Sequence, residues 1–231
     1  GCHPPEHTRA PSVAELREWQ TLARGHIKLL TIAAELDGAE ELCRAATQEM
    51  GIAVSLGHQL AGGEDVRRLV NAGATLCTHL GNGMPNMIHR HQNSLWASLA
   101  DDRLSTMLIT DGEHLPADAI TTFVRAKRAA RIIVTSDVAP VAGLAPGVYA
   151  WGSTMVRVED TRVRAADLPC LAGSGSLMLH CMNHLASIRQ DGGGNSGGGW
   201  LMTREELGRA GFDNPLKVIG VGGETGQRLR G

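Results

Sequence analysis

The chain has 231 residues, of which 42% are hydrophobic and 20% are charged, and its formal net charge is -2 at pH 7. This composition supports a substantial folded core and argues against global disorder. The near-neutral charge gives no reason to expect nucleic acid or an anionic membrane as a partner. No apolar run reaches the roughly 18 residues that a membrane-spanning helix needs.

Cysteine usage and the first residues bear on the compartment. The five cysteines are odd in number and show no CxxC spacing, which favours reduced thiols and a cytoplasmic location. The start of the chain, GCHPPEHTRAP, is polar and rich in proline, so we expect no signal peptide. Because the first residue is glycine rather than methionine, we expect a processed or tagged chain or a fragment of a longer one.

Short apolar runs alternate with helical patterns over the first 137 residues, after a loop at 1–11. The helical patterns predict helices at 13–23, with Ser12 as the cap, and at 40–50, 64–72, 95–100 and 116–129. The apolar runs predict strands at 27–33, 52–56, 74–77, 106–109 and 132–135. Such alternation with short connections is typical of parallel βαβ units. These five strands are three fewer than an eight-stranded barrel needs.

The pattern changes after Asp137. Residues 148–158 and 161–163 predict a β-hairpin with Glu159 and Asp160 near its turn. The segment LAGSGS, 171–176, reads as a loop of small residues, and the tract GGGNSGGG, 192–199, as a glycine-rich surface loop. Helices are expected at 177–188, 203–209 and 214–219. We therefore expect one domain over 1–231, with the hairpin as an insertion at about 148–163.

Two histidines end consecutive predicted strands. His58 follows the run IAVSLG, and His79 follows ATLCT. Consecutive strands of a parallel sheet are neighbours, so the two imidazoles could converge on one cation, and neutral imidazole suits zinc. The alternative is that both histidines only end their strands and bond to the backbone.

Other polar residues along the chain also have more than one interpretation. Asp137, after IIVTS, could move protons to and from a metal-activated water and a leaving amine, or could be a turn or N-cap aspartate. His114 could be a ligand, a proton carrier or a substrate contact. Glu35 could be a carboxylate ligand or could cap the Asp37-Gly38 turn. Arg90 could bind a phosphate by two parallel hydrogen bonds or be a solvated loop charge.

Six segments in order, GCHPPEH, SLGHQLA, ATLCTHLGNGMP, ITDGEHLP, IIVTSDVAP and LAGSGS, together resemble the N-acetylglucosamine-6-phosphate deacetylases of the amidohydrolase superfamily. The resemblance covers Gly1 to about Leu179, and the segment NPLKVIG shows a weaker similarity. It implies an α/β fold of the (β/α)8 TIM-type barrel. It also implies a divalent metal, with zinc as the expected one, and removal of acetate from an amino sugar phosphate.

The family's functional positions map onto this chain residue by residue. His58 and His79 are similar to the two histidine metal ligands, and Asp137 takes the position of the catalytic acid/base. His3 resembles the loop histidine that polarises the acetamide carbonyl. Arg90 falls at a phosphate-binding arginine that the family takes from the neighbouring subunit, which implies a homodimer. The substrate-binding positions fall on Cys2, Asn82, Gly83, Asp111, His114, Leu171, Ala172 and Gly173.

The chain also departs from the family pattern. The family's glutamate ligand lies in a HxEGP motif about ten residues before the position of His3, ahead of Gly1. Losing one of three protein ligands should weaken metal binding severely, so an inactive isolated chain is one expectation. The first three barrel strands would precede this chain as well. The family's glycine-rich stretch near Arg90 is replaced by NMIHRHQN. Two alternatives stay open: a related amidohydrolase for another N-acyl or cyclic amide, and a non-catalytic remnant that folds on a partner chain.

Overall fold

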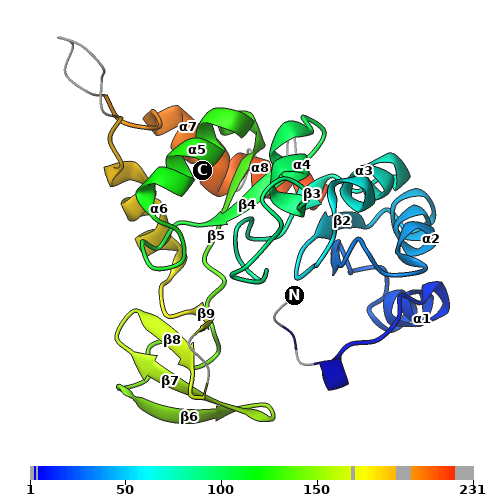
Figure 1. Cartoon of the computed structure of the whole chain (residues 1–231), viewed down its shortest axis with the longest axis horizontal. Helices are drawn as coiled ribbons and strands as arrows, with labels where there is room; N and C mark the ends of the chain where they lie inside the picture. Colours follow the sequence, from blue (N-terminus) through cyan, green and yellow to red (C-terminus); the bar gives the residue numbers. More distant parts are fainter. Residues whose placement is uncertain (1–2, 4, 168–169, 191–198, 222–231) are drawn as a thin grey trace.

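The structure, a computed structural model, describes residues 3, 5–167, 170–190 and 199–221. It contains a parallel sheet early in the chain and an antiparallel sheet after it (Figure 1). The parallel sheet has the order β1-β2-β3-β4-β5, so each strand pairs with the next one in sequence. Its strands are β1 Leu29–Ile32, β2 Ala53–Leu56, β3 Leu76–Cys77, β4 Ser105–Ile109 and β5 Ile132–Thr135.

A helix precedes β1 and one lies in each connection of this sheet, as the sequence predicts. Ser12 caps the first of them, because its hydroxyl accepts a hydrogen bond from the Glu15 N–H at 3.2 Å. Neighbouring helices pack in chain order, α2 on α3, α3 on α4 and α4 on α5. The helices are α1 Val13–Leu22, α2 Ala39–Arg44 with a π-helical extension Ala45–Glu49, α3 Gly63–Ala72, α4 Ser94–Ala100 and α5 Ala117–Lys127.

The main core lies between these helices and the parallel sheet. Its largest fully buried side chains are aliphatic, among them Leu56, Leu69, Leu108 and Ile132, in keeping with an aromatic content of only 3%. Strands and helices that each neighbour the next one in sequence form the repeating unit of α/β barrels. Within the described residues no strand pairs β5 back to β1. A parallel α/β fold is therefore confirmed, and the closed eight-stranded barrel stays a prediction.

The antiparallel sheet is larger than the predicted hairpin. The segment 148–158 is two strands rather than one, because Gly152 adopts a left-handed φ of 59° and reverses the chain there. The predicted small-residue loop at 171–176 was also wrong in part, since its first four residues form a strand paired with β8. A small core of Val156, Val158 and Val163 packs under the sheet. The strands are β6 Gly147–Trp151, β7 Thr154–Glu159, β8 Arg162–Ala165 and β9 Leu171–Ser174.

The C-terminal helices return to the parallel sheet. The Asn214 side chain donates hydrogen bonds to the carbonyls of Ala129 and Ile132 at 2.9 and 2.7 Å, which ties the last helix to the start of β5. Of the predicted loop at 192–199, only Gly199 lies within the described residues. No helix in the described part of the chain is long and apolar enough to cross a bilayer. These helices are α6 Met178–Ser187, α7 Arg204–Gly208 with a π-helical extension Arg209–Asp213, and α8 Asn214–Val218.

Candidate active site

Three residues predicted at strand ends share an uncommon backbone conformation. His58, His79 and Asp137 have φ angles of 50°, 28° and 49°. Each lies two residues beyond the end of its strand, β2, β3 and β5 respectively. Left-handed backbone costs a residue with a side chain roughly 1 kcal/mol or more. It persists where the surrounding structure holds it, often at functional sites. The three residues therefore mark the carboxyl edge of the parallel sheet as the candidate site.

The two histidines converge as predicted. The Nε2 atoms of His58 and His79 lie 2.8 Å apart, and their rings are nearly perpendicular, with centroids 4.6 Å apart. His3 stacks on the other side of this pair, with its ring centroid 4.0 Å from that of His58 and an interplanar angle of 13°. Three imidazoles from three segments thus gather at one point of the sheet edge.

The electrostatics of the pair suit a metal ligand. Burial, followed by repulsion from His79 and His3, lowers the pKa of His58 to about 4. Burial also lowers the pKa of His79, partly offset by the Asp137 carboxylate. Both imidazoles are therefore neutral at pH 7, the form that binds a cation.

The geometry of the pair also fits a tetrahedral cation. Two nitrogen ligands about 2.1 Å from a tetrahedral zinc ion lie roughly 3.4 Å apart, so the Nε2 atoms, now 2.8 Å apart, would have to separate by a few tenths of an ångström. Within the described residues no group of three or more His, Cys, Asp or Glu side chains could hold a metal ion. The described part of the chain thus offers two ligands of a site that needs at least one more.

The turn after His79 is shaped by glycine. Gly83 has a φ of 64°, and a Cβ atom at this position would lie 3.0 Å from both His58 Nδ1 and His79 Cε1. The turn can press against both imidazoles only because Gly83 has no side chain. The neighbouring Asn82 side chain places its Nδ2 in a buried position with no hydrogen-bond partner in the described structure. An unpartnered buried donor here is available to a ligand.

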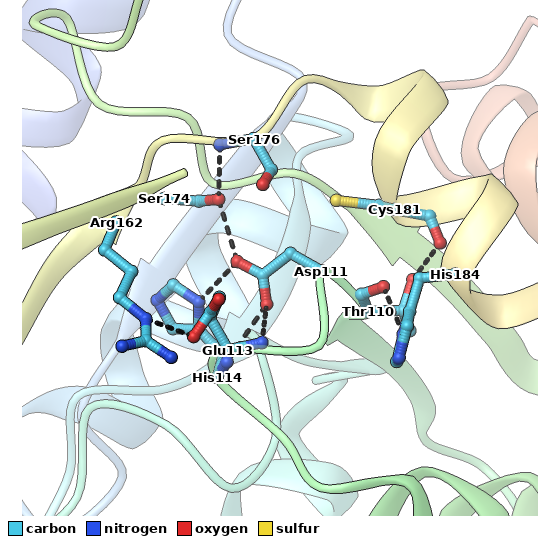
Figure 2. Close-up of polar contacts among 9 residues, drawn as sticks. All are labelled: Thr110, Asp111, Glu113, His114, Arg162, Ser174, Ser176, Cys181 and His184. Atoms are coloured by element: carbon cyan, nitrogen blue, oxygen red, sulfur yellow. Dashed lines mark hydrogen bonds and ion pairs between the residues drawn. The ribbon is translucent and has the colours of Figure 1, made fainter. Parts of the chain in front are cut away.

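The loop after β4 carries a buried carboxylate–imidazole pair (Figure 2). His114 Nδ1 donates to Asp111 Oδ2 at 2.8 Å, while Asp111 Oδ1 accepts from the backbone N–H groups of Glu113 and His114 at 2.9 and 3.0 Å. Burial opposes ionisation of Asp111, but the hydrogen bonds from His114 and Glu113 outweigh it and hold the pKa of the carboxyl well below its usual range. Since Nδ1 donates to the carboxylate, a neutral His114 ring has its lone pair on Nε2.

Strand β9 lies directly against Asp137. The Ser174 N–H donates to the Asp137 carbonyl at 2.8 Å. Gly173 has a φ of 70°, and a Cβ there would come within 3.2 Å of that same carbonyl. The predicted substrate residues of 171–173 therefore flank the acid/base candidate, as part of a strand rather than of a free loop.

Other predicted residues lie elsewhere. Arg90 lies exposed in the loop between β3 and α4, where its carbonyl accepts from Trp96 Nε1 at 2.8 Å. Cys2 lies outside the described residues. Glu35 does not cap the Asp37-Gly38 turn as expected: its Oε1 accepts from the Leu60 N–H at 2.7 Å, just after His58. Glu35 therefore braces the loop that carries a metal-ligand candidate.

Two further residues support the site through hydrogen bonds, and neither of them was predicted from the sequence. Gln59 Oε1 accepts from the Ala34 N–H at 3.3 Å, which joins the loop after β2 to the end of β1. Ser174 hydrogen-bonds to Asp111 Oδ2 at 2.9 Å. The only signal for either was a polar residue beside a predicted site residue in an apolar context, which does not specify a partner.

A cavity of about 440 Å³ borders the site beside His3 and His58. Its other walls come from α1 and β1 and include Trp19, Leu30 and Leu36. Neither His79 nor the Asp111–His114 pair lines it. The cavity therefore extends the site toward β1 and does not itself enclose the candidate catalytic groups.

Comparisons with known proteins identify relatives of this chain. The chain is 36% identical over 185 residues to N-acetylglucosamine-6-phosphate deacetylase of Bacillus subtilis, a match that covers 80% of the chain and 46% of that protein. It is 33% identical over 175 residues to N-acetylgalactosamine-6-phosphate deacetylase of Escherichia coli O157:H7, covering 75% and 45%. The chain thus spans about half the length of the curated relatives it matches.

Solved structures show the same fold. The crystal structure of N-acetylglucosamine-6-phosphate deacetylase from Thermotoga maritima superposes with a TM-score of 0.81 at 28% identity, over 96% of this chain and 56% of that one. No family model matches the chain. On the curated relatives and this structural match, the chain belongs to the N-acetylglucosamine-6-phosphate deacetylase family.

Proposed function

We propose that this chain carries most of the active site of a metal-dependent hydrolase that removes the acetyl group from N-acetylglucosamine 6-phosphate. The observation that carries the proposal is the convergence of His58 and His79, whose Nε2 atoms lie 2.8 Å apart at the ends of adjacent parallel strands. The relatives that bear this activity in their names supply the substrate class. The substrate and the partners of the whole protein are part of the same proposal.

His58 and His79 would hold the cation through Nε2, and zinc is among the divalent metals that neutral imidazole ligands suit. When bound, such a cation supplies Lewis acidity toward a water molecule and the acetamide carbonyl. Catalytic zinc sites use three protein ligands. The remaining ligand, a glutamate in the family pattern, would come from outside the described residues.

Asp137 is the proposed acid and base. Its side chain is exposed at the sheet edge, and its charge acts on His79. It would take a proton from the attacking water as the new carbon–oxygen bond forms. It would then give that proton to the nitrogen as the carbon–nitrogen bond breaks, leaving acetate and the free amine. His3, stacked on His58, would donate a hydrogen bond to the carbonyl oxygen.

The remaining predicted residues would bind the sugar. His114 offers the Nε2 lone pair to a sugar hydroxyl because Asp111 holds its Nδ1–H. Asn82 offers the unpartnered N–H of its side chain. Arg90 would bind the 6-phosphate of a substrate in the neighbouring subunit of a homodimer. Further contacts are assigned to Cys2, Gly83, Leu171, Ala172 and Gly173.

A second substrate has a specific observation in its favour. One relative, 33% identical, is named an N-acetylgalactosamine-6-phosphate deacetylase. The two sugars differ only in the configuration of one hydroxyl, and one misplaced polar contact discriminates by about tenfold or more. Rates with both phosphorylated sugars, and with unphosphorylated N-acetylglucosamine, decide between the two sugars and test the role of the phosphate.

The first test is the zinc content per chain after loading and desalting, with His58→Ala and His79→Ala as controls. We expect the wild type to retain more zinc than either variant, although with two of three ligands it should bind zinc more weakly than a complete site. Zinc retained in both variants, or absent from the wild type, would overturn the metal site in this chain. Acetate release without any such metal would point to another hydrolytic mechanism.

The thiols support a reducing location. Cys43, Cys77 and Cys181 are buried and free, so a cytoplasmic setting is proposed for the chain.

A further inference from the structure

Ser174, the last residue of β9, makes an unusually complete set of hydrogen bonds for one small side chain. It is only 1% exposed. Its N–H donates to the Asp137 carbonyl at 2.8 Å, and its own carbonyl accepts from the Ala139 N–H at 2.8 Å. Its hydroxyl donates to Asp111 Oδ2 at 2.9 Å and accepts from the Ser176 N–H at 2.9 Å. One residue of the antiparallel sheet is thus bonded to both loops of the candidate site.

The direction of the hydroxyl bond follows from the chemistry of Asp111. Hydrogen bonds hold the pKa of this carboxyl well below its usual range, so the carboxylate only accepts and the Ser174 hydroxyl must donate. The Ser176 N–H fills a lone pair of the hydroxyl oxygen, which fixes the hydroxyl from the other side. Its proton therefore has one well-defined acceptor.

Ser174 and His114 share that acceptor. Asp111 Oδ2 receives both the Ser174 hydroxyl and His114 Nδ1, as the dashed lines of Figure 2 show. The hydroxyl does not bond to the His114 ring, so Ser174 is not arranged as a nucleophile with His114 as its base. It acts on His114 only through the carboxylate between them.

A second contact joins the same two regions. Arg162 of β8 forms an ion pair with Glu113, which lies between Asp111 and His114 in the loop after β4 (Figure 2). Both side chains are partly exposed, so this pair is expected to contribute little on its own. Together the two contacts fasten the antiparallel sheet to the loop after β4, one in the core and one near the surface.

We propose that Ser174 is a positioning residue that sets the orientation of the Asp111 carboxylate and, through it, of the His114 ring. Through its backbone it also holds the loop of Asp137 against β9. Any movement of β9 is therefore transmitted to both loops at once. The consequence for catalysis rests on the proposed function, whereas the effect on His114 does not.

Ser176 provides a matched control. It lies two residues away in the same segment and is 2% exposed, but its hydroxyl has no hydrogen-bond partner in the described structure. Ser174→Ala and Ser176→Ala each remove one buried hydroxyl, and only the first removes a donor to Asp111. Ser174→Cys keeps a side-chain donor at this position, although a weaker one on a larger atom, so it covers the case in which the alanine variant does not fold.

The experiment is NMR of the histidine side chains at one fixed pH, with His114→Gln to assign the His114 signals. In Ser174→Ala the Nδ1–H of His114 loses its competitor for Asp111 Oδ2, so we expect its proton resonance to move downfield. Ser174→Cys should move it less, and Ser176→Ala should leave it in place. A His114 resonance that is unchanged in Ser174→Ala, or shifted equally in Ser176→Ala, would overturn the proposal.

Activity gives an independent reading. If the chain deacetylates the sugar phosphate, Ser174→Ala should lower kcat/KM about tenfold or more, the effect of losing a hydrogen bond to a charged group, with Ser176→Ala near wild type. Equal losses in the two variants would count against positioning. If the zinc-loaded chain does not deacetylate the sugar phosphate, the proposed function fails for this chain, while the NMR comparison still decides the role of Ser174.

Discussion

His58 and His79 occupy equivalent places on adjacent strands. The register of β2 and β3 pairs Leu56 with Cys77, and each histidine lies two residues beyond its member of this pair. Both then turn through left-handed backbone, with φ angles of 50° and 28°. Parallel register and matching turns together bring their Nε2 atoms to 2.8 Å.

Gly83→Ala tests how closely this pair is packed. A Cβ there would lie 3.0 Å from atoms of both imidazoles, so the methyl group must displace one or both rings. We expect zinc affinity to fall at least about tenfold, as for changes that disturb ligand orientation. Zinc titration of the two proteins measures it.

Gly143→Ala is the matched control for the backbone cost. Gly143 has a φ of 83°, similarly left-handed, but no atom lies within 4 Å of the position of its Cβ. Both variants should lose roughly 1 kcal/mol of stability from the conformation alone, and only Gly83→Ala should lose zinc. Equal zinc binding in both would mean that the imidazoles do not depend on this turn.

Two variants of Glu35 test whether this residue supports the loop of His58 or binds the metal directly. Its Oε1 accepts from the Leu60 N–H at 2.7 Å, two residues after His58. Glu35→Gln keeps an oxygen acceptor there, whereas Glu35→Ala removes it. We expect Glu35→Ala to lose about 1 kcal/mol of stability and to weaken zinc binding, with Glu35→Gln close to wild type in both. Urea unfolding and zinc titration test this, and zinc loss in Glu35→Gln equal to that in Glu35→Ala would assign the carboxylate a charged role.

The strands and the metal-ligand pair were predictable because each depends on local sequence. The five apolar runs are separated by helical patterns, and parallel connectivity then makes His58 and His79 neighbours. The antiparallel sheet was less predictable. A turn at Gly152 divides one apparent strand into two, and the residues of β9 are too small to show the alternation of a strand.

Contacts between segments far apart in the chain were not predictable. Ser174 and Asp111 are 63 residues apart, and the hydrogen-bonded Thr110 and Cys181, also drawn in Figure 2, are 71 residues apart. Nothing in either local sequence names the other as a partner. A buried polar side chain must find a partner, but its identity depends on how the two sheets dock.

The buried thiols predict a loss of stability at alkaline pH. Burial raises the pKa of Cys43, Cys77 and Cys181 from 9.0 to about 11. Below pH 9 the folded and unfolded chains both keep these protons. Between pH 9 and 11 the unfolded chain releases protons that the folded chain retains, so the free energy of unfolding falls as pH rises, by up to about 2 kcal/mol for each thiol.

Urea unfolding at pH 8 and pH 10 measures this fall, and Cys43→Ala should reduce it. Labelling by iodoacetamide gives a second reading at pH 8.5. The exposed Cys170 should react in the folded chain, and the three buried thiols should react only after unfolding. Rapid labelling of the buried thiols in the folded chain would contradict their burial.

Arg90 predicts complementation between subunits. Its side chain is exposed on the loop between β3 and α4, so it is free to reach a neighbouring copy, as the proposed homodimer requires. Arg90→Ala and His79→Ala should each be inactive toward the phosphorylated sugar. In a mixed dimer the Arg90→Ala subunit keeps its histidines and receives the arginine of its partner, so one site is restored. Random mixing in a two-fold dimer should then recover about a quarter of wild-type activity.

Unphosphorylated N-acetylglucosamine controls for the phosphate, since Arg90→Ala should leave its turnover unchanged. Sedimentation of the mixture confirms that dimers form and exchange, and exchanged dimers without recovered activity would place the arginine within its own subunit's site or outside any site.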